Sequence, residues 1–149
     1  MSSKLYIEAA VSYEEKGQWV YLAVNVLTFG GYLWVVAGLA ANTPVADVDY
    51  VPVLLSAIAI AIVLSIVGRI LVEVLGPSES HTEDVRDRDI GRFGEYVGGI
   101  LLGLAMLVPF GLAIAEIDHF WIANTIYVAF ALSALVSAMV KLVAYRRGL

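Results

Sequence analysis

Four ionisable residues near the ends of long apolar segments are the ones in this chain best placed to do chemistry. Arg69 and Glu73 stand four positions apart in one segment, and Glu95 and Lys141 lie in two others. Ionisable side chains within membrane segments mark ligand, ion or proton sites by default. Residues four apart share a helix face, so Arg69 can pair with Glu73. We therefore predict a polar binding site of Arg69, Glu73, Glu95 and Lys141; the alternative is structural ion pairs that reach the membrane interface.

Other kinds of chemistry find little support. The chain has no cysteine, which excludes disulfides, thiolate metal sites and cysteine nucleophiles. Its sequence contains no Walker, dinucleotide-binding, HExxH or GxSxG motif. Glu116, Asp118 and His119 within one turn are weak evidence for a cation site. We expect no metal, no cofactor and no catalytic residue. A net charge of −5 also argues against direct nucleic-acid binding.

The apolar residues gather into blocks of membrane-spanning length. The chain of 149 residues is 60% hydrophobic and 15% charged, whereas soluble domains are about 45–50% apolar and about 25% charged. About 20 apolar residues in a helix cross a bilayer, and the alternation typical of a membrane barrel is absent. We predict an all-α membrane protein: a four-transmembrane-helix bundle in one domain over 1–149, with a polar loop over 76–92 and spans at about 18–41, 51–72, 94–117 and 120–144. The acidic N-terminus does not resemble a secretory signal, so the first span is expected to be retained.

The basic residues give the spans a direction. All nine lie in the N-terminus, the 76–92 loop, the C-terminus or the span ends beside them. The other two connections carry no base and four acids: Asp47, Asp49, Glu116 and Asp118. The positive-inside rule then predicts that both termini and the 76–92 loop face the cytoplasm of a bacterial plasma (inner) membrane. The predicted polar site would lie at the cytoplasmic rim.

The two halves of the chain resemble each other. Residues 17–20 (Gly-Gln-Trp-Val) open the first span, and residues 94–97 (Gly-Glu-Tyr-Val) open the third. The second and fourth spans each end with a serine four positions before a base: Ser65 and Arg69, Ser137 and Lys141. We predict two parallel-repeated helical hairpins related by an axis along the membrane normal. Chance similarity between apolar helices is the alternative.

Small residues suggest where helices pack. The third span carries closely spaced glycines and a proline: Gly94, Gly98, Gly99, Gly103 and Pro109. Small residues four apart let helix backbones approach closely, so we expect internal seams, with a homo-oligomer interface as the alternative. Pro109 is expected to kink the span. We expect Asn25 and Asn124 to hydrogen-bond between helices.

The stretch before the third span has charges of alternating sign. It is expected to form local ion pairs or a short helix leading into that span. Its bases, Arg86, Arg88 and Arg92, are predicted to contact lipid or a partner protein.

The same stretch carries a family resemblance. Residues 84–96 read D-x-R-D-R-D-I-x-R-x-G-E-Y. With this pattern the chain resembles a family of uncharacterised small bacterial membrane proteins, of actinobacterial type. Residues 12–16, 118–124 and 144–148 fit the same family. The resemblance implies a four-helix membrane protein, often encoded beside helix-turn-helix regulators, and it supplies no activity or catalytic residue.

Three functions remain open from the sequence. The leading hypothesis is a non-enzymatic regulatory or scaffold protein that acts through a cytoplasmic protein partner, because the charged loop is distinctive and catalytic motifs are absent. The alternative is a small oligomeric transporter or channel, favoured by the repeat, the glycines and Pro109. A lipid- or quinone-handling enzyme is a minor alternative. The lipid bilayer is the expected surrounding in each case.

Overall fold

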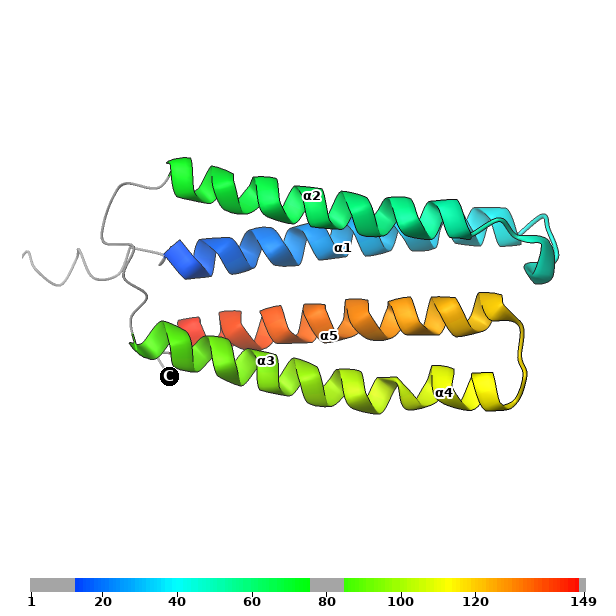
Figure 1. Ribbon diagram of the computed structural model, residues 1–149. Coiled ribbons are helices and arrows are strands. Elements are labelled where there is room, and N and C mark those ends of the chain that lie inside the picture. Colours follow the sequence, from blue (N-terminus) through cyan, green and yellow to red (C-terminus); the bar gives the residue numbers. More distant parts are fainter. Residues whose placement is uncertain (1–12, 76–84, 148–149) are drawn as a thin grey trace, which may run out of the picture.

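The structure, a computed structural model, describes residues 13–75 and 85–147, and nearly all of these are helical (Figure 1). A short 3₁₀ helix, η1 (Val45–Asp47), lies between the first two α-helices. The α-helices are α1 (Tyr13–Ala40), α2 (Val51–Leu75), α3 (Val85–Ala105), α4 (Leu107–Ile114) and α5 (His119–Arg147). The helices α3 and α4 follow one another in a single span, so the described chain forms four spans that are long and apolar enough to cross a membrane.

The outer surface of the bundle is apolar. Only 6% to 22% of each apolar window is buried inside the protein. Large side chains such as Trp34 and Leu75 are 83% and 78% exposed. Because water would penalise so much exposed apolar surface, this surface fits hydrocarbon and identifies a multi-pass membrane protein. The predicted all-α fold with four spans is confirmed.

The third span begins earlier than the sequence indicated. The predicted polar loop over 76–92 is too long at its second end, because residues 85–92 are the first turns of α3. This is the short helix that the alternating charges predicted as one option. Residues 76–84 lie outside the described residues. Asp87 lies in the first turn of α3, where its negative charge interacts favourably with the positive end of the helix dipole. Asp89 lies three positions from both Arg86 and Arg92, a spacing at which opposite charges are neighbours on a helix. Opposite charges at this spacing stabilise a helix in a stretch that is too polar for hydrocarbon.

Pro109 interrupts the third span. The α-helical pattern stops at Ala105 and resumes at Leu107, with Met106 in a turn between them. Proline has no N–H to donate, and its ring crowds the carbonyl four residues earlier, which here belongs to Ala105. The expected kink therefore takes the form of a break between α3 and α4, with Pro109 itself buried.

The spans pack as two hairpins, α1 with α2 and α3–α4 with α5, joined by contacts between α1 and α5 (Figure 1). Among the described helices, α2 and α3 have no extensive contact with each other. We call the end with the first turns of α1 and α3 the basic end, because the described bases gather there: Lys16, Arg69, Arg86, Arg88, Arg92, Lys141, Arg146 and Arg147. The opposite end is called the acidic end, and it carries Asp47, Asp49, Glu116 and Asp118.

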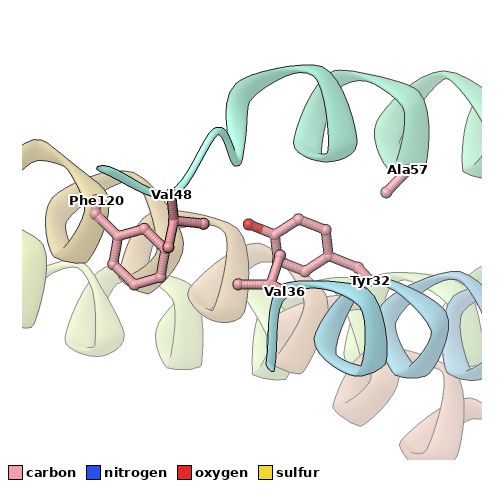
Figure 2. Close-up of a cluster of buried hydrophobic side chains, with 5 residues drawn as sticks. All are labelled: Tyr32, Val36, Val48, Ala57 and Phe120. Carbon is pink, nitrogen blue, oxygen red and sulfur yellow. The ribbon is translucent and has the colours of Figure 1, made fainter. Parts of the chain in front are cut away.

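Aromatic side chains fill the acidic half of the bundle. Tyr32, Val36, Val48, Ala57 and Phe120 form a buried cluster, and Figure 2 shows the Val48 side chain between Phe120 and Tyr32. This cluster joins α1, α2, α5 and the connection around η1, so it fills the space between these helices in the acidic half.

A polar bond ties the same region together. The Tyr32 hydroxyl donates to Asn124 Oδ1 at 2.6 Å, between α1 and α5. The ring of Tyr127 packs edge-on against Tyr32, with centroids 4.8 Å apart. Asn124 thus bonds between helices as predicted. The prediction was wrong for Asn25, whose amide donates to the Tyr21 carbonyl of its own helix.

Glycines bring α3 against α5 in the basic half. A Cβ on Gly98 would lie 2.9 Å from Ser137 Cβ, and the Ser133 hydroxyl donates to the Gly98 carbonyl at 2.8 Å. Gly94 faces the Lys141 side chain just as closely. By contrast, Gly99 and Gly103 have open space where a Cβ would stand. Of the four glycines predicted to pack, Gly94 and Gly98 therefore form the seam, and Gly99 and Gly103 do not.

Replacing Gly98 by valine should destabilise the protein by about 1–3 kcal/mol, because the added side chain overlaps Ser137 and Ser133. Gly103→Val is the matched control on the same helix, with open space at its Cβ. Thermal unfolding in detergent, followed by circular dichroism, measures both. Equal melting temperatures for the two variants would contradict the seam.

Candidate functional site

A polar cavity of about 540 Å³ lies between the four spans in the basic half. Small-molecule sites commonly have about 300–1,000 Å³. Apolar and small residues of α1, α3 and α5 make up part of the wall: Gly17, Val20, Tyr21, Gly98, Gly99, Phe130 and Ala134. The remaining wall is polar: Gln18, Ser65, Arg69, Glu95, Ser133, Ser137 and Lys141. Three of the four rim residues predicted from sequence therefore line one cavity, and Glu73 is the exception.

The ammonium group of Lys141 reaches α3. Its Nζ lies 3.5 Å from Glu95 Oε1, with the lysine side chain 12% exposed and the glutamate side chain 74% exposed. The aliphatic stem of Lys141 lies against Gly94, and a Cβ there would stand 2.7 Å from Lys141 Cε. Gly94 therefore opens the path by which Lys141 crosses α3 to its partner. Because the glutamate is largely solvated, the pair positions the lysine more than it stabilises the fold.

Arg69 connects the first two helices. Its Nη2 lies 3.2 Å from Glu14 Oε1, and the two side chains are 60% and 23% exposed. The sequence pointed to Glu73 as the partner and missed Glu14, which fell before the predicted start of the first span. The structure begins α1 at Tyr13, and this extra turn places Glu14 beside Arg69. A surface pair of this kind contributes about 0–1 kcal/mol, so its effect is mainly to orient the guanidinium.

Several polar groups of the wall are not used by the fold. Ser133 donates to the Gly98 carbonyl, but the side chains of Gln18, Ser65 and Ser137 make no hydrogen bond to any described residue. None of their polar atoms is buried without a partner, so these atoms are open to the cavity. Donors left open beside hydrocarbon are costly unless a polar ligand or water satisfies them.

Two similar pairs of residues face the same space. Ser65 and Arg69 on α2, and Ser137 and Lys141 on α5, each place a hydroxyl one turn from a base. Residues four apart share a helix face, so each pair presents both groups together. The sequence shows the same spacing of serine and base in both halves of the chain. That spacing predicted a repeat, but it did not identify Ser65 and Ser137 as site residues.

The three predicted loop arginines lie outside the cavity, on the first turns of α3. Arg86, Arg88 and Arg92 are exposed. The Arg86 guanidinium donates to the Tyr145 carbonyl at 3.5 Å, which links α3 to the last turns of α5. Nearby, the Arg146 guanidinium stacks 5.2 Å from the ring of Trp19. Arg88 and Arg92 are four positions apart and share one helix face.

Within residues 13–75 and 85–147, no three acidic or histidine side chains come together as metal ligands. The weak candidate at the acidic end has a structural use instead. Asp118 Oδ1 accepts a hydrogen bond from the Phe120 backbone N–H at 2.8 Å. The carboxylate therefore caps the N-terminus of α5.

A second cavity, of about 470 Å³, lies beside the break between α3 and α4. Its wall is apolar: Gly103, Met106, Leu107, Pro109, Phe110, Ala113, Ile122 and Ile126. These side chains carry no ionisable or hydrogen-bonding group, so the polar cavity is the candidate functional site.

No family model matches the chain, and comparisons with curated proteins and with solved structures found no match. The function is therefore inferred from the site itself.

Replacing Gly94 by alanine should push the Lys141 stem aside and expose its ammonium group. The expected result is severalfold faster acylation of Lys141 by an amine-reactive ester, measured by peptide mass spectrometry with exposed Lys16 as internal standard. Gly91→Ala, one turn earlier with open space at its Cβ, is the control. An unchanged Lys141 rate in Gly94→Ala would show that Gly94 does not position the lysine.

Proposed function

We propose that this chain is a non-enzymatic regulatory or scaffold protein of the bacterial inner membrane. A polar ligand binds in the cavity at the basic end, and the exposed first turns of α3 contact a cytoplasmic protein partner. The observation that carries the proposal is the polar cavity between all four spans, at the end where the exposed arginines also stand.

The charge distribution supports a cytoplasmic basic end. The described bases lie at that end, whereas the acidic end carries four acids and no lysine or arginine. The positive-inside rule places such an end in the cytoplasm. The bacterial origin and membership of the family with the D-x-R-D-R-D-I pattern are part of this proposal and rest on residues 84–96.

The first turns of α3 support partner binding. The helix α3 begins at Val85, nine positions before the seam at Gly94, which corresponds to a rise of about 13 Å along the helix. This extension carries Arg88 and Arg92 on one face, where no other described element covers them. A partner with acidic groups would meet a rigid, preorganised pair of guanidinium groups.

A small oligomeric transporter or channel is the second candidate. The cavity and the break at Met106 favour it, since transporters bind substrates beside interrupted helices. Open space at Gly99 and Gly103 also leaves room for another copy of the chain to approach. Against it, the cluster around Tyr32 and Phe120 fills the space between α1, α2 and α5 in the acidic half. The cavity therefore resembles a binding pocket more than a passage.

Two matched hairpins remain our interpretation of the sequence repeat. Among the described residues, an ion pair joins the two helices of each hairpin: Arg69 pairs with Glu14, and Lys141 pairs with Glu95. In both, the base stands on the second helix and the acid on the first.

The orientation can be tested because the chain has no native cysteine. Arg88→Cys should react with a membrane-impermeant maleimide only after the inner membrane is permeabilised, and Asp47→Cys should react without that step. Labelling of single-cysteine variants in cells with a permeable outer envelope measures both. The reverse pattern would place the basic end outside.

Removing both charges in Arg88→Ala/Arg92→Ala should abolish co-purification of the cytoplasmic partner from gently solubilised membranes. The reason is that alanine removes each guanidinium group, and with it the charge-assisted hydrogen bonds to the partner. Lys16→Ala removes a base from the same end but from α1, and it should leave recovery unchanged. Recovery that does not depend on Arg88 and Arg92, together with solute flux through the protein in liposomes, would favour the transporter.

A further inference from the structure

The geometry points to a phospholipid as the ligand: we propose that the cavity binds a lipid phosphate group, which enters sideways between α2 and α3. This inference rests on the proposed function and names the ligand class of the same site.

The first step is the lateral opening. The helices α1 and α5 pack together, and α2 and α3 stand on their outer flanks without extensive contact with each other. All four contribute to the cavity, so α1 and α5 form its floor and α2 and α3 its side walls. The space between the side walls faces the surrounding bilayer. A lipid can therefore reach the site without leaving the membrane.

The second step is the donor set. Arg69 and Lys141 line the cavity together with one acid, Glu95, so bases outnumber acids in the wall. Ser65 and Ser137 add hydroxyl donors one turn deeper than the two bases. Phosphate oxygens accept several hydrogen bonds at once, and guanidinium and ammonium groups are their preferred partners in proteins.

The acids do not remove this preference. Glu14 lies 3.2 Å from Arg69, and Glu95 lies 3.5 Å from Lys141. An ammonium group has three N–H donors, so Lys141 can bond to Glu95 and still donate to a phosphate oxygen. The Glu95 carboxylate, 74% exposed, can also accept from the hydroxyl or ammonium group that most phospholipid headgroups carry. The wall therefore suits both parts of a headgroup.

The third step separates a lipid from a soluble phosphate compound. The polar residues lie toward the basic end, and the deeper wall is apolar at Phe130 and Ala134. On α5, Phe130 stands 11 positions from Lys141, a rise of about 16 Å. A soluble phosphate ester would leave this apolar depth unused. A phospholipid places its phosphate at the interface and its first methylene groups below it. The cavity wall has the matching order, with polar residues toward the basic end and Phe130 and Ala134 deeper.

The test uses the whole protein in detergent micelles, with short-chain phosphatidylglycerol as the probe and native mass spectrometry as the readout. Gly99→Leu fills the cavity from α3, since Gly99 lines it and has open space at its Cβ. We expect binding to weaken about tenfold, the loss of ~1.4 kcal/mol. Gly111→Leu, which also has open space and lies outside both cavities, should bind like the wild type.

Three competitors identify what is recognised. Excess inorganic phosphate or glycerol phosphate should displace little of the probe, and neutral short-chain diacylglycerol should displace none. Full displacement by glycerol phosphate would overturn the lipid in favour of a soluble ligand, and displacement by diacylglycerol would overturn recognition of the phosphate. Arg69→Gln/Lys141→Gln should weaken binding while circular dichroism shows an intact fold.

Equal binding by Gly99→Leu and wild type would also overturn the inference. The proposed regulatory function would survive that result, because the dependence of partner recovery on Arg88 and Arg92 is measured separately. If partner recovery fails to depend on these arginines while Gly99→Leu loses the lipid, the lipid site stands and the partner proposal falls.

Discussion

Hydrocarbon offers no hydrogen bonds, and this constraint governs where every polar group of the bundle lies. Helices satisfy the backbone internally. Polar side chains inside the spans mostly bond to a carbonyl, as Thr28 does to Val24 O and Thr125 does to Trp121 O. Others bond between helices, as Tyr32 does to Asn124. Against this background, the open donors of the polar cavity stand out as the groups that the fold does not use.

The two halves of the bundle solve the packing problem differently. In the acidic half, large rings fill the space between α1, α2 and α5, where Tyr32 and Phe120 belong to one cluster. The basic half is built from glycines and serines, which bring α3 close to α5 at Gly98. Small residues allow this close contact but cannot fill the space toward α1 and α2. The cavity is therefore a consequence of using small side chains for the seam.

Much of the fold follows from the sequence, because hydropathy and block length alone mark a membrane span. The seam was predictable at Gly94 and Gly98. Spacing could not reveal that Gly99 and Gly103 face away from it, since all four glycines fit small-residue spacings. The alternating charges of residues 85–92 predicted a short helix leading into the third span as one of two options, and the structure has that helix. Its start could not be fixed from hydropathy, because these residues are too polar to register as part of a span.

The site could be predicted only in part. Glu95 and Lys141 were predicted to share one site at the rim, and the structure brings them together as an ion pair. The partner of Arg69 did not, because Glu14 lies before the apolar block and its position depends on how far α1 extends. The cavity depends on the lack of extensive contact between α2 and α3. A residue pattern within a single span does not show which spans contact each other.

The break at Met106 has a consequence for how the protein meets membranes of different thickness. The third span runs over 30 residues, from Val85 to Ile114, and is divided into a long segment and an eight-residue segment. Its apolar part, residues 94–114, is about as long as the hydrocarbon core is thick. Spans adapt to a thinner or thicker bilayer by tilting or bending. The break at Met106 lets α4 take a different tilt from α3, which the contact at Gly98 holds on α5. Thinning or thickening of the bilayer is then absorbed at the acidic end, and the geometry around Lys141 is insulated from it.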